Sequence, residues 1–362
     1  MRQKHILSIL MAGLFTLMTA ISFGQEHASG AVNTKEGVDE MIDHHLDDSH
    51  YFDFFADGEE GKHYGFALPI ILIDNGLHVF SAAEFDHGNQ VVERAGQHYA
   101  LYQSKIYKTD AEGTLHFDED GFPTNAKPWD FSITKNVFVI FLVALLMLLV
   151  FGGMAKTYKK QPLPRKFGRF LEPVIVFVRD DIAREMIGPK YKKYMSFLLT
   201  VFFFILFLNL LGMLPFGVNV TGNITITFAL ALVTFFIVQF SGNKDYWKHV
   251  FWFPDVHPIV KIILIPIEIL GLFTKPFALM IRLFANMTAG HVIIMSLLGL
   301  IVIFQNWIAG PAFFGFSLFM MLIEILVAFL QAYIFTLLSA LYISSAVEEH
   351  HPGSEEEEIP IV

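Results

Sequence analysis

A single arginine, Arg282, lies inside a long stretch of sequence that is almost free of charge. Between residues 276 and 347 the only formally charged side chains are Arg282 and Glu324. A charge at the centre of a bilayer costs roughly 2.5–3.5 kcal/mol on insertion scales, so such residues usually face a water-filled cavity, a partner or an ion path. The alternatives are that Arg282 snorkels to an interface or forms a buried salt bridge with Glu324.

The polar residues after Arg282 recur at helical spacing. Asn286 follows Arg282 by four residues, so both side chains lie on one helix face. Ala285 and Ala289 flank that face, and their small side chains would let another helix approach closely. His291 comes nine residues after the arginine and therefore points to the opposite side.

The next apolar stretch carries a second polar pair. Glu324 and Gln331 are seven residues apart and share one helix face. A histidine titrates near neutral pH, and the proton affinity of a carboxyl group depends on its burial. A fixed cation, a titratable histidine, a carboxylate and two amides together indicate a path for protons.

Membrane-spanning helices must position these residues, because the composition favours lipid over water. Of the 362 residues, 54% are hydrophobic and 17% are charged, and the mean hydropathy is +0.51. A helix needs about 20 apolar residues to cross the hydrocarbon core. This rule predicts an all-α polytopic fold with five spans, at about residues 137–155, 195–215, 224–240, 259–304 and 316–343.

The fourth stretch is too long for a simple span. Its roughly 46 residues would extend about 70 Å as a helix, against a hydrocarbon thickness of about 30 Å. We therefore expect a steep tilt, a bend at one of its prolines or glycines, or an interfacial beginning. The segment 167–186 is a further candidate for a helix on the membrane surface.

Loop charges orient the five spans. The segment 156–193 contains eleven Lys and Arg residues, which places it in the cytoplasm by the positive-inside rule. The connections 216–223 and 306–315 carry no Lys or Arg and suit the outside. The mature N-terminus is then periplasmic, and residues 351–362 form an acidic cytoplasmic tail.

The N-terminal third differs from the rest. Residues 1–24 have a positive start and an apolar core, as in a secretory signal peptide, with an uncleaved anchor as the alternative. Residues 25–134 then form an exported extension ahead of the transmembrane region at 135–350. Alternating runs around Asp74-Asn75-Gly76 indicate a small, β-rich region with hairpins.

Composition also excludes several classes of site. The chain has no cysteine, which excludes disulfides and thiolate metal sites. Nine of the fifteen histidines lie in the extension, among them His44, His45 and His50. They form no fixed ligand spacing, so a solvated acidic segment is favoured over a metal site, and no cofactor is expected. The net charge of −10 does not suit nucleic-acid binding.

Several motifs closely resemble the a subunit of F-type ATP synthases, over about residues 165–350. They are Arg282 to His291, Asn209 to Pro215, Leu330 to Phe335, Lys275-Pro276, Asn223-Ile224-Thr225 and Glu348-Glu349-His350. The resemblance implies a non-catalytic ion-channel subunit of the F0 sector in the inner membrane of a bacterium. It also implies, as partners, a ring of c subunits, the b subunits of the peripheral stalk and the remaining ATP synthase.

The resemblance assigns roles to individual residues. Arg282 would be the essential arginine facing the ring, with Gln331 as its neighbour on the last helix. His291 and Glu324 would line the outer half-channel, with histidine and carboxylate exchanged in place relative to some members. Glu268 resembles a glutamate near the cytoplasmic exit, and an interfacial carboxylate is its alternative. A proton is favoured as the ion, but the binding carboxylate belongs to the ring, so sodium stays open.

Two other classes of function fit the sequence less well than an ion-channel subunit does. A self-sufficient secondary transporter would show inverted repeats, but the chain has no internal duplication and its five spans do not divide into equal halves. A receptor with the extension as ligand domain would leave Arg282, Glu324 and Gln331 unexplained. The extension itself lies outside the resemblance and is expected to cap the outer entrance or to stabilise the outer face.

Overall fold

The computed structural model describes residue 42 and residues 46–57, 62–159, 167–214, 218–252, 257–304 and 309–348. The expected signal peptide, the first part of the extension with His44 and His45, and the acidic tail at 351–362 lie outside these residues. The chain divides into two compact units. The first comprises 1–142, 211–220 and 290–323, and the second comprises 143–210, 221–289 and 324–362.

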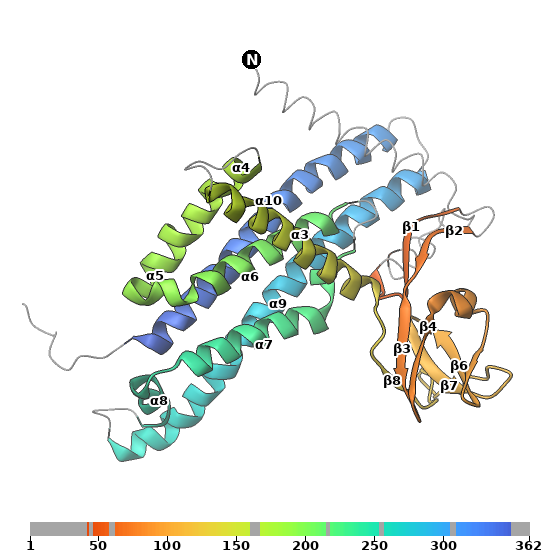
Figure 1. Ribbon diagram of the computed structural model, residues 1–362, viewed down its shortest axis with the longest axis horizontal. Helices are drawn as coiled ribbons and strands as arrows, with labels where there is room; N and C mark the ends of the chain where they lie inside the picture. The colour runs from red at the N-terminus through yellow and green to blue at the C-terminus, as the bar shows by residue number, and fades with distance from the viewer. Residues whose placement is uncertain are drawn as a thin grey trace, which may run out of the picture. The chain divides into compact units, whose positions relative to one another are not determined.

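The first long helix that the structure describes follows the β-rich extension in the sequence (Figure 1). Helix α3 (Lys135–Tyr158) contains no charged residue between Lys135 and Lys156. A helical segment follows, built from α4 (Phe167–Phe177), a π-helical stretch (Val178–Arg184), α5 (Glu185–Ile187), a 3-10 turn (Gly188–Lys190) and α6 (Tyr191–Gly212). The segment expected to be a surface helix is therefore helical.

Two shorter helices precede the long pair. Helix α7 (Ile224–Ser241) begins after Asn223, whose side chain accepts a hydrogen bond from the amide of Thr225. Helix α8 (Lys244–Phe251) begins after Asn243 in the same way, with Tyr246 as donor. Asparagine is favoured at this position because its oxygen satisfies one of the unpaired amides at a helix start.

Helix α9 (Pro258–Phe304) is one continuous helix of 47 residues, with Pro266 and Pro276 inside it. Helix α10 (Ala309–Val347) has 39 residues. Five helical segments are long and apolar enough to cross a membrane: Lys135–Tyr158, Gly168–Gly212, Ile224–Ser241, Val260–Ile301 and Ala309–Val347. The prediction of five apolar helical segments is confirmed, but the fourth is not unusual in its length, because the second, fourth and fifth segments have 45, 42 and 39 residues.

The extension is β-rich, as predicted. Strands β1 (Tyr51–Asp57) and β2 (Lys62–Ala67) form a hairpin. A second sheet has the order β4-β3-β8, from Leu77–Ser81, Pro69–Ile73 and Trp129–Asp130. A third has the order β5-β6-β7, from Val92–Arg94, Gln97–Tyr102 and Lys105–Thr109. All of these pairs are antiparallel.

The extension has its own hydrophobic core. Ile70, Leu72, Phe85 and Tyr99 are completely buried in it. The turn between β3 and β4 contains Asn75 at φ 52°, in the left-handed region that asparagine tolerates better than most residues. The hairpin expected at this motif is confirmed.

Candidate functional site

In the second unit, one side of α9 is uncovered around the arginine. Arg282, Ala285, Asn286 and Ala289 are all exposed, whereas Leu283 is fully buried. The exposed stripe continues toward the helix start through Leu270, Phe273, Phe277 and Ile281. The apolar members, at 270, 273, 277, 281, 285 and 289, recur every three to four residues and form one face of the helix, and Arg282 and Asn286 lie beside them. The face expected from the spacing is therefore open, and the cation lies along the edge of an apolar stripe.

The two amides of the predicted site meet behind this face. The side-chain nitrogen of Asn286 on α9 donates to the side-chain oxygen of Gln331 on α10 at 2.9 Å. Gln331 is 1% exposed, and the neighbouring Ala328 and Ala332 are completely buried. Small side chains allow two helices to approach closely, which is why the short amides reach each other. The bond fixes α10 against the helix that carries the arginine.

The last helix also buries the predicted carboxylate. Glu324 is 5% exposed, and neither of its oxygens has a hydrogen-bond partner in the part of the chain that the structure describes. No ion pair joins Glu324 to Arg282 among the described residues. The structure therefore does not support the alternative of a buried salt bridge between the only two formal charges in residues 276–347.

His291 belongs to the first unit, in the C-terminal part of α9, and is 8% exposed. Glu324 belongs to the second unit, so the expected pairing of histidine and carboxylate stays a prediction. Both are buried polar groups within apolar helices. Burial of an ionisable group in a membrane helix is costly, and such groups usually mark a function such as proton transfer.

Glu268 lies on α9, two turns before Lys275, and is partly exposed. Its negative charge acts on Tyr246 of α8. The pKa of Tyr246 is raised mainly by burial, and Glu268 adds to this rise, while a hydrogen bond to Gln239 opposes it. Glu268 is thus close to α8, the short helix between α7 and α9. If the predicted orientation holds, α8 lies on the same side of the membrane as the lysine-rich segment 156–193.

Packing between helices of the second unit holds the arginine helix in place. The rings of Phe235 on α7 and Phe273 on α9 stack with centroids 5.9 Å apart. The ammonium of Lys275 lies 5.5 Å from the ring centroid of Tyr342 on α10. In the sequence, Lys275 and Pro276 stand out only as part of a motif. The contact with Tyr342 gives Lys275 a structural role.

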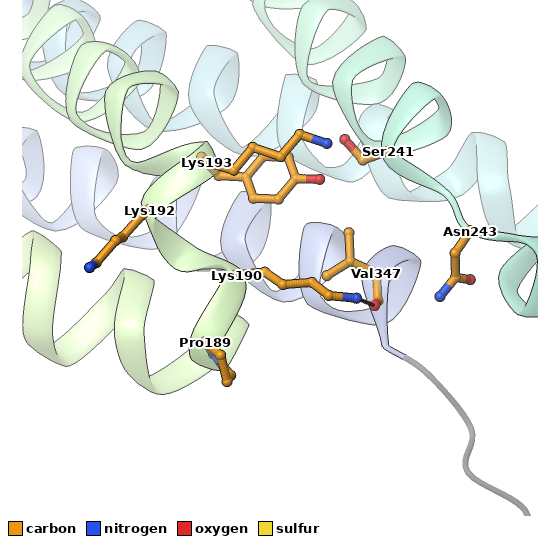
Figure 2. Close-up of a pocket in the computed structure, with 8 residues that line it drawn as sticks. Pro189, Lys190, Lys192, Lys193, Ser241, Asn243 and Val347 are labelled. Atoms are coloured by element: carbon orange, nitrogen blue, oxygen red, sulfur yellow. Dashed lines mark hydrogen bonds between the residues drawn. The ribbon is translucent and has the colours of Figure 1, made fainter.

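The C-terminal end of α10 is held by two residues that sequence reasoning missed. Lys190 donates from its ammonium to the carbonyl of Val347 at 3.1 Å, as Figure 2 shows. The backbone amide of Asn243 donates to the carbonyl of Ala346 at 3.1 Å, and its side chain donates to that of Glu348 at 2.8 Å. Three successive carbonyls that lack partners within the helix are thereby satisfied.

A second missed contact joins α6 to the turn before α7. Asn209 is completely buried near the end of α6, and its side-chain oxygen accepts a hydrogen bond from the hydroxyl of Thr221 at 2.8 Å. The sequence signal was available, because an asparagine inside an apolar span is costly unless it is bonded. In the sequence, Asn209 stands out only as part of a motif, and no role is predicted for it.

The chain resembles known protein families and individual proteins. The ATP synthase A chain family matches residues 137–344, and a domain of unknown function matches residues 41–131. The chain is 40% identical over 309 residues to ATP synthase subunit a of Chloroherpeton thalassium, covering 80% of this chain and 90% of the relative. It is 40% identical over 316 residues to ATP synthase subunit a 2 of Prosthecochloris aestuarii, covering 83% and 97%.

A third relative gives a similar result. The chain is 45% identical over 234 residues to ATP synthase subunit a of Myxococcus xanthus, covering 61% of this chain and 76% of the relative. Together with the five apolar helices, these matches confirm the resemblance drawn from the motifs. The protein is a multi-pass membrane protein and belongs to the ATP synthase A chain family.

Proposed function

We propose that this chain is the ion-channel subunit of the membrane sector of a rotary ATP synthase and couples proton flow to rotation. It would do so as a stator beside a ring of c subunits, held by the b subunits of the peripheral stalk. The observation that carries the proposal is the uncovered face of α9, where the guanidinium of Arg282 lies among apolar and small side chains. A cation in such a stripe calls for an anionic partner on another polypeptide.

The chemistry of the arginine explains its proposed role. A guanidinium does not lose its proton in a protein, so Arg282 is a permanent cation. A carboxyl group on the ring must be neutral to face lipid, and a nearby cation favours its ionised form. A ring carboxyl that reaches Arg282 therefore releases its proton, and one that moves past must gain a proton before it returns to lipid. Arg282 also blocks a direct leak between the two half-channels.

The remaining polar residues are proposed to serve the two half-channels. His291 and Glu324 would pass protons from the outer side, and Glu268 would lie near the cytoplasmic exit. Asn286 and Gln331 would set the distance between α9 and α10 beside the arginine through their hydrogen bond. The membrane potential drives the transfer with about 2.3 kcal/mol per charge per 100 mV. The proposed ion is the proton, with sodium as the alternative.

The test is the Arg282→Ala variant of the complete ATP synthase in membrane vesicles. We expect the variant to insert and assemble but to lose ATP synthesis driven by a proton gradient, because no cation remains to discharge the ring carboxyl. A matched control is Lys261→Ala, which removes another cation from α9, one that lies 4.4 Å from the ring centroid of Trp252. The control should retain synthesis. Wild-type synthesis rates in assembled Arg282→Ala vesicles would refute the proposal.

A further inference from the structure

The exported extension is attached to the first turns of α3 by backbone and ring contacts. The backbone amide of Lys135 donates to the carbonyl of Ser49 at 2.9 Å, and that of Asn136 donates to a carboxylate oxygen of Asp48 at 3.2 Å. These amides begin the helix and have no partner within it, so the extension supplies their acceptors. Aspartate is also favourable here because it complements the positive end of the helix dipole.

Aromatic rings extend this attachment. Phe138 on α3 lies edge-on to Phe52 of β1 and to Phe66 of β2, with centroids 5.4 and 5.3 Å away. The first hairpin of the extension therefore packs directly on the start of a membrane-spanning helix. The extension is thus a fixed part of the first unit at this end of α3.

A second contact brings the extension to the part of α9 that carries His291. Ile42 is 8% exposed and packs with Leu46 against Val292, Met295 and Ile303. Val292 directly follows His291 in the sequence, and Met295 is one turn further on. Ile42 therefore packs on the same stretch of helix that carries the buried histidine.

Charged groups connect the extension with that histidine. Three carboxylates, those of Asp47, Asp48 and Asp53, act on the ammonium of Lys135. The charge of Lys135 in turn acts on His291. Burial increases along this series, because Asp47 is exposed, Asp48 and Lys135 are partly exposed, and His291 is buried.

The net charge of this group suits a cation. Three carboxylates and one ammonium give this group a net negative formal charge. A negative group at the opening of a low-dielectric passage raises the local concentration of cations. The ammonium of Lys135 offsets only one of the three negative charges.

Asn136, which follows Lys135 at the start of α3, is a buried polar group. Its side chain is 2% exposed, and its side-chain oxygen has no hydrogen-bond partner among the described residues. A buried amide oxygen without a partner is unfavourable, and polar sites of this kind are where proteins hold internal water. The position therefore favours a hydrated passage over a dry helix contact.

We propose that the exported extension forms the outer entrance of the proton path, with Asp47, Asp48, Lys135 and Asn136 leading to His291. This inference rests on the proposed function. It gives a role to the region matched by a domain of unknown function. Protons would collect at the carboxylates and pass along hydrated polar groups to the histidine.

The absence of cysteine allows a direct test of hydration. Asn136→Cys and His291→Cys are made one at a time in the complete ATP synthase, and proton conduction is measured in vesicles with and without silver ion, which binds thiolates. We expect silver to remove most of the conduction of Asn136→Cys. The control is Leu145→Cys on α3, whose side chain is 53% exposed on the helix surface, and silver should leave it unchanged.

A charge test avoids the risk that a buried cysteine prevents assembly. Asp47→Asn with Asp48→Asn should slow proton uptake at low ionic strength by roughly two- to tenfold, and added salt should abolish the difference. The matched control is Glu119→Gln with Asp120→Asn, which removes the same charge from an exposed turn of the extension. This control should conduct as the wild type does.

The outcomes separate the inference from the proposed function. Suppose that silver blocks His291→Cys but not Asn136→Cys, and that the Asp47 and Asp48 variant conducts as its Glu119 and Asp120 control does. The entrance then lies elsewhere, so the inference is overturned while the proposed function stands. If the wild-type complex does not conduct protons at all, the proposed function fails and the inference fails with it. Silver block of Asn136→Cys or a specific effect of the Asp47 and Asp48 variant supports the inference.

Discussion

Asn286 and Gln331 join two helices through one amide hydrogen bond, although the first is exposed and the second is buried. Such bonds between membrane helices contribute about 0.6 kcal/mol on average and up to about 1.7 kcal/mol. That amount is small for the stability of the whole protein. Its importance lies in geometry, since the bond lies one turn from Arg282 and orients the last helix beside it.

This bond predicts coupling between the two amides. Asn286→Leu and Gln331→Leu should each lower the thermal stability of the purified complex, and the double variant should lose less than the sum, by about 0.6–1.7 kcal/mol. The measurement is a double-mutant cycle in nanodiscs. Ser345→Ala is the control, because the Ser345 hydroxyl donates to carbonyls of its own helix. Strictly additive losses would show that the bond does not form.

The chemistry of this site could be predicted at the level of residue type and spacing. Arg282 and Asn286 share an exposed face as the four-residue spacing requires. The bond from Asn286 to Gln331 could not be derived from spacing, since its partners are 45 residues apart and depend on how two helices cross. The pairing of His291 with Glu324 is of the same kind and stays a prediction.

Helix α10 depends on other elements at its C-terminal end. Its last carbonyls accept hydrogen bonds from Lys190 and Asn243, which are 157 and 105 residues away from their acceptors. The same asparagine begins α8, because its side-chain oxygen accepts from Tyr246. One residue thus ends one helix and starts another. Shifts of α10 would also move Gln331, so this clamp at the helix end supports the site.

Loss of this clamp should loosen both helices. Asn243→Ala removes two side-chain hydrogen bonds, each with a net value of about 0.5–1.5 kcal/mol. We expect faster hydrogen exchange in the last turn of α10 and in α8, and a lower rate of proton-driven ATP synthesis. Lys192→Met is the control, since Lys192 is exposed and contributes no such bond. Unchanged exchange at the end of α10 would contradict the role of Asn243.

The positions of the helices were predictable for a simple physical reason. Crossing a bilayer requires a length of apolar sequence, and length is visible in one dimension. The clamp was not predictable in this way, because Lys190 lies in a basic segment where a lysine is normally solvated. The hairpins of the extension were visible from alternation and from the Asp74-Asn75-Gly76 turn, whereas its contact with α9 joins residues that are distant in sequence.

At the scale of the whole molecule, the five candidate spans among the described residues predict that the segment before α3 and the end of α10 lie on opposite sides of the membrane. The segment between α3 and α6 carries eleven Lys and Arg residues, so it is expected in the cytoplasm. The extension before α3 is then outside, where it can serve as an entrance. Helix α8 lies between the third and fourth spans and is then inside, with Glu268 nearby.

This orientation can be tested without reference to activity, because the chain has no cysteine of its own to react. Asp120→Cys places a thiol on an exposed turn of the extension, and Lys248→Cys places one on the exposed side of α8. In spheroplasts, a membrane-impermeant maleimide should label Asp120→Cys directly and Lys248→Cys only after lysis. The reverse pattern would invert the protein, and the extension could then not form an outer entrance. Labelling of both thiols before lysis would mean that the number of crossings between the extension and α8 is even rather than the predicted three.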